Sequence, residues 1–233
     1  MADNILAGPA YFFTGTDTGV GKTSVCLAIM EVLKRRGYRV AAMKPVASGG
    51  TITGSGVLNH DARQMMEHTN IPHDYRTINP YSLSLPAAPV IAAKRDHLKI
   101  EAGPILDGYD RLSESADVVL VEGVGGWHVQ LSESLWMEDL VKLLHLPVIM
   151  VAGIRLGCIN HAILTAEAIS RADCRLYGWI GNQIDRDYQN SQETLALLSE
   201  SIEAPMLAAI PYLSQFDIRQ VMSFLADLRM PEL

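Results

Sequence analysis

The chain has 233 residues, 48% of them hydrophobic and 19% charged, a size and composition that fit a globular α/β domain with a sizeable core. Its formal net charge is −7, from 26 acidic and 19 basic residues with no basic block, which argues against nucleic-acid binding. The longest apolar run, residues 146–154, is too short to span a bilayer, and the first residues lack the features of a signal peptide.

Segments with strand and helix patterns alternate along the whole chain. Short apolar runs predict strands at 11–14, 38–43, 117–121, 148–151, 176–180 and 206–210. Amphipathic or helix-favouring segments predict helices at 24–36, 59–69, 87–96, 105–115, 136–144, 160–171, 189–202 and 216–228. Strands that alternate with helices indicate right-handed βαβ units, so we predict one α/β domain over residues 1–233, with a mainly parallel sheet flanked by helices.

The segment 14–23 has the features of a phosphate-binding loop, because it joins an apolar strand to a helix and ends in Gly21-Lys22-Thr23. Backbone N–H groups of such a loop bind phosphate oxygens together with the positive end of the following helix. Lys22 would reach the terminal phosphates, and the Thr23 hydroxyl would bind Mg²⁺. One position departs from the strict pattern, since Thr16 stands where glycine is usual. The alternative is a glycine-bearing turn with a solvated lysine, but the order of strand, loop and helix favours nucleotide binding.

Ligands of open α/β sheets bind beyond the carboxyl ends of the strands. The segments that follow the predicted strands are therefore expected to meet at one edge; they are residues 14–23, 44–49, 122–127, 153–157 and 181–182. The glycine-rich stretch 49–56 resembles a mobile active-site loop more than a domain linker.

Four polar residues at this edge each have a functional and an ordinary interpretation. Glu122 follows four apolar strand residues, as an acidic Mg²⁺ partner does in phosphate-loop enzymes, although such a residue also suits a helix cap. Asp61 opens a predicted helix and would supply a second carboxylate, or simply complement the helix dipole. Lys44 would stabilise charge on a transferring phosphoryl group, or be a surface lysine, and Ser48 would hydrogen-bond the phosphoryl acceptor.

With these residues the chain resembles the dethiobiotin synthetases, ATP-dependent enzymes that close the ureido ring in biotin synthesis. The resemblance rests on four blocks, residues 14–23, 44–49, 121–127 and 156–162, and on smaller matches at 59–62, 79–81, 178–182 and 210–213. The blocks occur in family order over almost the whole chain. The family carries threonine at the position of Thr16, so that departure from the strict pattern is a family feature.

The resemblance implies a P-loop NTPase-like, doubly wound fold and a reaction in three steps. The amine 7,8-diaminononanoate reacts with CO₂ or bicarbonate to give a carbamate, ATP phosphorylates the carbamate, and the second amine attacks the mixed anhydride and expels phosphate. Lys22 and Lys44 would neutralise charge during transfer, and Ser48 would orient the carbamate. The oxygens that hold Mg²⁺ would come from Thr23, Asp61 and Glu122.

The family resemblance also implies how ATP and the substrate carboxylate are bound. The amide of Asn182 suits adenine, which residues 211–213 would flank. The substrate carboxylate would bind at the start of a helix contributed by the neighbouring subunit of a homodimer, at Gly157, Cys158, Ile159 and Asn160. The full set expected around ATP is Thr18, Gly19, Val20, Gly21, Lys22, Thr23, Ser24, Asp61, Glu122, Gly123, Val124, Gly125, Asn182, Gln183, Pro211, Tyr212 and Leu213.

Two positions differ from many family members. Gly19 stands where some carry a glutamate, so any side-chain role there is absent, and Arg155 stands where lysine is frequent. Arginine keeps the charge but changes the geometry of any substrate contact. For Cys158 and Ile159, core packing is the plainer interpretation of the side chains.

Other classes of function are less well supported. A partitioning or site-selection switch ATPase would carry a lysine early in the loop, where this chain has Thr16, Asp17 and Thr18. The charges of the amphipathic segment 216–228 balance, which favours core packing over membrane binding. A cobyrinate-amidating enzyme would need a glutamine-hydrolysing domain, and a binding module would leave Lys44 and its acidic neighbours without a shared purpose.

Cysteine and histidine usage gives two further expectations. Cys26, Cys158 and Cys174 are widely spaced without a CxxC pair, so we expect packed, reduced thiols in a cytoplasmic protein. The seven histidines show no metal-ligand spacing, so we expect no zinc site.

Overall fold

A six-stranded sheet forms the centre of the computed structural model, which describes residues 9–228. Its order is β12-β11-β10-β1-β7-β2, and every neighbouring pair is parallel. The strands are β1 (Ala10–Gly15), β2 (Val40–Met43), β7 (Val118–Glu122), β10 (Val148–Ile154), β11 (Leu176–Gln183) and β12 (Met206–Ile210). The predicted parallel α/β sheet is confirmed. The predicted domain range extends to residues 1–8 and 229–233, which lie outside the described part of the chain.

Nine helices surround the sheet within the described residues. They are α1 (Lys22–Arg35), α2 (His60–His68), α3 (Tyr75–Ile78), α4 (Pro89–Arg95), α5 (Ala102–Ser115), α6 (Met137–Leu144), α7 (Cys158–Arg171), α8 (Ser191–Ser201) and α9 (Ile218–Phe224). Eight were predicted, with ends that differ by a few residues. The largest differences are in α5, which begins three residues early because Pro104 is tolerated in a first turn, and in α9, which is shorter than expected. The single-turn helix α3 was not predicted.

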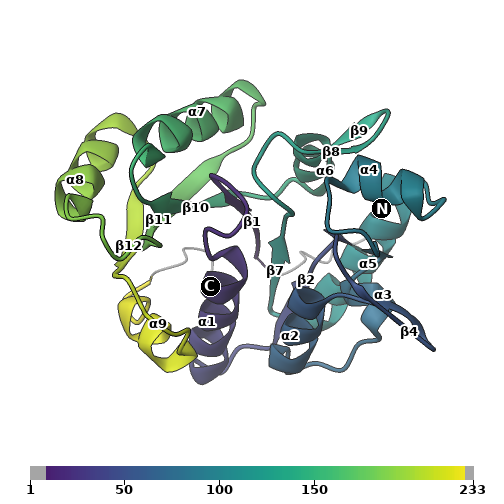
Figure 1. The fold of residues 1–233 in the computed structure, drawn as a ribbon. Helices are drawn as coiled ribbons and strands as arrows, with labels where there is room; N and C mark the ends of the chain where they lie inside the picture. The colour runs from purple at the N-terminus through teal and green to yellow at the C-terminus, as the bar shows by residue number, and fades with distance from the viewer. Residues whose placement is uncertain (1–8, 229–233) are drawn as a thin grey trace, which may run out of the picture.

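Side chains of the central strand alternate between two apolar layers. Tyr11 and Phe13 pack with α1 and α9 on one face, and Phe12 packs with α5 and α6 on the other. Figure 1 shows α1 and α9 below the sheet and α7 above it. Helix α7 also packs on α8 and covers the β10–β11 half of the sheet. Both faces are covered, as a doubly wound sheet requires.

Within the described part of the chain, three short strand pairs lie outside the main sheet. The first joins β3 (Val46–Ala47) to β6 (Tyr81–Ser82) in parallel. The others are antiparallel hairpins, β4 (Thr51–Thr53) with β5 (Gly56–Leu58) and β8 (Gln130–Ser132) with β9 (Leu135–Trp136). The stretch 49–56, expected as an active-site loop, instead forms most of the exposed β4–β5 hairpin, because its glycines supply the turn.

The C-terminal segment and the cysteines agree with the sequence interpretation. Val221, Met222 and Leu225 are buried against the layer that contains α1, so α9 packs as core. Cys26 and Cys158 are buried free thiols, and Cys174 is a half-buried one. Among residues 9–228, the helices are too short or too polar to cross a membrane.

Candidate active site

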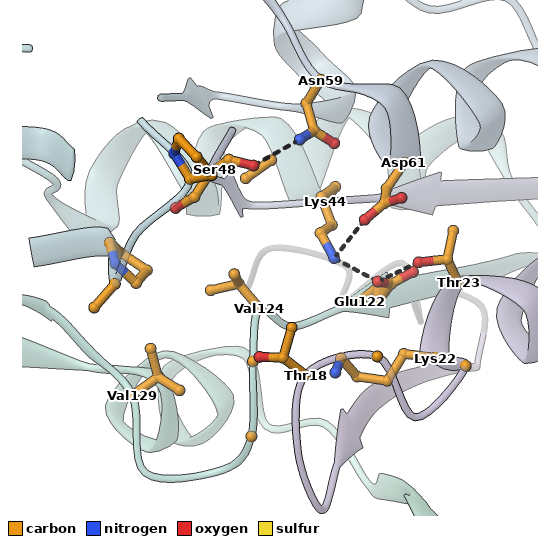
Figure 2. A pocket seen from close by; sticks show the side chains of 18 of the residues that line it. Thr18, Lys22, Thr23, Lys44, Ser48, Asn59, Asp61, Glu122, Val124 and Val129 are labelled. Carbon is orange, nitrogen blue, oxygen red and sulfur yellow. Dashed lines mark hydrogen bonds and ion pairs between the residues drawn. The ribbon is translucent and has the colours of Figure 1, made fainter. Parts of the chain in front are cut away.

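A cavity of about 820 Å³ lies at the carboxyl ends of β1, β2 and β7. It brings together many of the residues predicted from sequence: Thr18, Gly19, Gly21, Lys22, Thr23, Ser24, Lys44, Ser48, Asp61, Glu122, Val124 and Gly125. Figure 2 shows Lys44, Asp61, Thr23 and Glu122 turned toward one another, with Lys22 and Thr18 across from them. The parallel sheet explains this convergence, because its strands end at the same edge.

The phosphate loop enters α1 through a glycine that no other residue could replace without strain. Gly21 has φ 92° and precedes the first residue of α1. A Cβ atom at this position would lie 2.4 Å from Asn182 Nδ2, which donates a 2.8 Å hydrogen bond to the carbonyl of Val20. Both the left-handed backbone and the close approach of Asn182 therefore require glycine.

The end of β10 supports the first half of the loop. The Thr16 hydroxyl accepts a 3.2 Å hydrogen bond from the amide of Gly153, and the Thr16 amide donates to the Val151 carbonyl at 3.0 Å. The backbone at Thr16 has a negative φ, which any residue adopts. Threonine therefore fits at this position and adds a contact that glycine lacks.

Arg155, the second departure from the family pattern, also supports the loop. Its Nη2 lies 2.9 Å from Oδ2 of Asp17, and both side chains are about half exposed. The structure thus assigns this arginine a partner within its own chain, beside the phosphate loop.

We expect Arg155→Ala to raise the Kd for MgATP by at most about fivefold, because a solvent-exposed ion pair contributes about 1 kcal/mol or less. Arg155→Lys should bind nucleotide like the wild type. Titration calorimetry would measure both, and Asp17→Asn provides the second arm of a double-mutant cycle. An effect of Arg155→Ala that is undiminished in the Asp17→Asn background would show that the arginine acts through another group.

Lys22 is buried in the loop with only 7% of its surface exposed. Its Nζ donates a 2.9 Å hydrogen bond to the carbonyl of Asp17. Burial, and then the nearby charge of Lys44, lowers the pKa of Lys22 to about 8, against the opposing influence of the carboxylates. The site therefore holds two cations, Lys22 and Lys44, close together in a poorly solvated place. Bound anionic phosphates would reduce the repulsion between them.

Lys44 is a buried member of a charged cluster and not a surface lysine. It follows β2, is 3% exposed, and forms an ion pair with Oε1 of the fully buried Glu122. Its Nζ also donates to the Gly123 carbonyl at 2.9 Å and lies 3.8 Å from Oδ2 of Asp61. The Thr23 hydroxyl donates to the same Glu122 oxygen at 2.9 Å. Glu122 is the last residue of β7, which rules out the helix-cap interpretation.

The second carboxylate oxygen of Glu122 is buried and has no hydrogen-bond partner among the described residues. A buried anionic oxygen is costly unless it is paired or coordinates a metal. With Asp61 and the Thr23 hydroxyl alongside, the donor set consists of hard oxygens, which fits Mg²⁺. Asp61 is in the first turn of α2, where it complements the helix dipole, and its role toward a metal stays a prediction.

Comparison with known proteins decides the family. The model of a family described as "AAA domain" matches residues 9–219. An ATP-dependent dethiobiotin synthetase of Xanthomonas euvesicatoria pv. vesicatoria (strain 85-10) is 44% identical over 204 residues, which cover 88% of this chain and 91% of that protein. The chain belongs to the dethiobiotin synthetase family. A second member, from Aliivibrio fischeri (strain MJ11), is 42% identical and is covered over 90% of its length.

Solved structures of other proteins share the fold of this dethiobiotin synthetase family member. A ParA family ATPase from Chlorobium tepidum TLS superposes with a TM-score of 0.56 at 15% identity, over 94% of this chain and 91% of that one. The MinD cell division protein of Aquifex aeolicus gives a TM-score of 0.56 at 17% identity, with coverage of 97% and 92%. At these identities the likeness concerns the fold alone. The predicted phosphate-loop NTPase architecture and the prediction of an enzyme are confirmed.

Residues that the family resemblance assigns to adenine lie outside the cavity. Asn182 and Gln183 end β11, which extends three residues beyond its predicted end at residue 180, and Asn182 is in register with Ile210 of β12. Residues 211–213 therefore begin beside Asn182, near the start of α1. Their contact with a base stays a prediction. Two further predicted residues, Val20 and Gly123, are buried and do not line the cavity. The carbonyl of Gly123 accepts a hydrogen bond from Lys44.

The segment that the family resemblance assigns to the substrate carboxylate begins α7, away from the cavity. Gly157 precedes the helix with φ 87° and is exposed, as is Asn160. Cys158 is buried and Ile159 packs against the adjoining apolar cluster, so core packing is confirmed for both side chains. Their role toward substrate, through a neighbouring subunit, stays a prediction.

One wall of the cavity was missed from sequence. It is lined by Gln64, Pro86, Ala87, Ala88, Pro89 and Val129. The available signal was Pro86 before α4 and Pro89 as its first residue, since proline often marks a loop that enters a helix. Nothing in the local sequence indicates that this loop faces the phosphate loop, because tertiary packing brings the two together.

Proposed function

We propose that this protein uses ATP and Mg²⁺ to close the ureido ring of dethiobiotin from 7,8-diaminononanoate and CO₂. The observation that carries the proposal is the buried lysine at the end of β2. Lys44 lines the same cavity as Lys22, is 3% exposed, and pairs there with the buried Glu122. The Coulombic attraction of a buried ion pair often fails to offset its desolvation, so a buried pair that lines a cavity supports a role that uses the charge. The names of the relatives, ATP-dependent dethiobiotin synthetase, support the use of ATP and dethiobiotin as the product.

The residues would divide the work of the three steps. After CO₂ adds to one amine, an oxygen of the carbamate attacks the γ-phosphorus of ATP, and ADP leaves. Lys22 and Lys44 would neutralise charge on the transferring phosphoryl group and its acceptor. The second amine then attacks the carbonyl carbon, the C–O bond to phosphate breaks, and the ring closes. Ser48 would hold the carbamate in place for both steps.

Thr23, Asp61 and Glu122 would hold Mg²⁺, which neutralises phosphate charge when it is bound. The hard-oxygen donor set and the unpartnered Glu122 oxygen support this assignment. We further propose a homodimer in which the start of α7 binds the substrate carboxylate across the interface, in the cytoplasm.

One assay tests the function against its main rival. Purified protein with MgATP should release phosphate only when both the diamine and bicarbonate are present, and mass spectrometry should detect dethiobiotin. A switch ATPase shares the fold but would hydrolyse ATP at the same rate without the diamine. That outcome would reject the synthetase proposal. Light scattering would measure the oligomeric state. A protein that is strictly monomeric at a low concentration, and is still active at that concentration, would reject the shared substrate site.

Ser48→Ala is expected to raise the KM for the diamine by about tenfold, with nucleotide affinity unchanged, because a hydrogen bond to the carbamate is lost. The Ser48 hydroxyl is buried without a partner, so its removal should leave Tm unchanged or slightly higher. Steady-state kinetics and thermal melts measure the two effects. A lower Tm with an unaltered KM would mean that the hydroxyl supports the fold instead.

A further inference from the structure

A hydrogen-bonded chain runs through Asn59, which lines the cavity, and through Tyr75 and Asn79. The phenol of Tyr75, in α3, accepts a 2.7 Å hydrogen bond from the backbone amide of Asn59 and donates a 2.9 Å hydrogen bond to Oδ1 of Asn79. Asn59 and Asn79 are 6% and 1% exposed, and Tyr75 is half-buried. Buried polar side chains that are fully connected in this way fix local geometry.

Both ends of this chain reach the backbone of the segment that carries Lys44 and Ser48. Asn79 Nδ2 donates to the Lys44 carbonyl at 2.6 Å, and Asn59 Nδ2 donates to the Ser48 carbonyl at 3.0 Å. Asn59 also caps α2, since its Oδ1 accepts the Ala62 amide at 3.3 Å. The same residue therefore joins Ser48 to the helix that presents Asp61.

We infer that Asn59, Tyr75 and Asn79 are positioning residues. They fix the backbone of Lys44 and Ser48, and thereby the position of these two residues relative to the transferring phosphoryl group. Backbone hydrogen bonds also hold this segment, among them Lys44 N–H to the Ile78 carbonyl at 2.8 Å and Leu83 N–H to the Ala47 carbonyl at 2.7 Å. The side chains of Asn79 and Asn59 add restraints at the Lys44 and Ser48 carbonyls themselves. Positioning of this kind matters for catalysis because a small displacement of a reacting group costs much of the rate. The kinetic consequence rests on the proposed function, whereas the restraint on the backbone does not.

Tyr75→Phe removes only the phenol oxygen and leaves the Asn59 amide and Asn79 Oδ1 without their shared partner. Tyr81→Phe is the matched control, because the Tyr81 phenol is also half-buried but accepts the Glu101 amide, at 3.1 Å, outside this chain. Asn59→Asp is a second variant that keeps the cap on α2 and removes the donor to Ser48. It remains informative if Tyr75→Phe fails to fold.

Hydrogen–deuterium exchange measures the restraint directly. In Tyr75→Phe, amides in residues 44–50 should exchange about three- to tenfold faster, the effect of one lost hydrogen bond, while residues 14–24 stay unchanged. Tyr81→Phe should leave both segments unchanged. Equal exchange of residues 44–50 in Tyr75→Phe and Tyr81→Phe would overturn the inference. Faster exchange of both 44–50 and 14–24 in Tyr75→Phe, together with weaker MgADP binding, would also overturn it, because that result would show that the whole site is destabilised.

Kinetics measure the consequence. Tyr75→Phe and Asn59→Asp should each lower kcat for dethiobiotin formation by about tenfold, with the Kd for MgADP unchanged. Normal kcat alongside faster exchange would mean that the restraint has no role in the reaction and would overturn the positioning role. If wild-type protein forms no dethiobiotin, the proposed function fails, and the exchange result alone decides whether these side chains restrain the segment.

Discussion

Replacing Lys44 with alanine is expected to lower kcat for dethiobiotin formation by about 100-fold or more, with little change in the Kd for MgATP. The loss is large because the Lys44 ammonium is 3% exposed, and a preorganised charge in a poorly solvated site stabilises a transition state strongly. Nucleotide affinity should persist because, in the proposed site, the 14–24 loop with Lys22 would supply the contacts to the phosphates. Stopped reactions analysed for dethiobiotin and calorimetric titration with MgADP measure the two quantities.

A matched control and a stability measurement make the Lys44 result interpretable. Lys94→Ala makes the same chemical change at an exposed lysine of α4 and should leave kcat unaltered. Lys44→Ala also leaves Glu122 buried without its cation, so a lower Tm is expected from the same variant. Retained MgADP binding would show that the site is folded. Wild-type turnover by Lys44→Ala would remove the residue from the mechanism.

Replacing Glu122 with glutamine is expected to reduce turnover by about 100-fold and to raise the Mg²⁺ concentration needed for half-maximal rate. Glutamine has nearly the same shape, so the change removes one negative charge and little packing. It leaves Lys44 buried beside a neutral amide, which is expected to reduce the free energy of unfolding by about 3 kcal/mol. Chemical denaturation and a Mg²⁺ titration of the initial rate measure these effects.

Asp61→Asn removes a half-exposed carboxylate near Lys44 and can be compared with Glu122→Gln, which removes a buried one. Asp61 is 40% exposed and lies 3.8 Å from Lys44, whereas Glu122 has 1% exposure and contacts Lys44 directly. Solvent screens the Asp61 charge, so its loss should alter the Mg²⁺ requirement with little effect on stability. Equal destabilisation by both variants would contradict the view that burial sets the strength of the Glu122 interaction.

The sequence predicts the parts of this molecule that depend on local chemistry. The phosphate loop is recognisable because glycine, lysine and threonine act there through neighbouring atoms of one short segment. The apolar runs that became β7 and β10 are recognisable because a strand buried on both faces needs apolar residues throughout. Glu122 and Lys44 were found for the same reason, since each directly follows or ends such a run.

Features that depend on tertiary packing were not predictable in the same way. The role of Asn59 in joining α2 to Ser48 requires a contact 11 residues away, and the helix-cap pattern explains only one of its hydrogen bonds. Lys44 has the same sequence appearance whether it is exposed or 3% accessible. The hairpin in the glycine-rich stretch 49–56 was not predicted because glycine suits both an irregular loop and a tight hairpin.

The contact between Thr16 and Gly153 has a consequence for how such loops are recognised in other sequences. A search pattern that demands glycine at position 16 describes a loop whose backbone alone meets the neighbouring strand. Here a hydroxyl meets that strand 137 residues later in the chain, and a Cβ at Gly153 would lie 2.7 Å from the side chain of Val20. Glycine is therefore required at 153 on the partner strand, by the approach of Val20, while position 16 accepts a side chain. The fit between loop and strand thus depends on residues that are distant in the sequence, which a pattern confined to the loop does not contain.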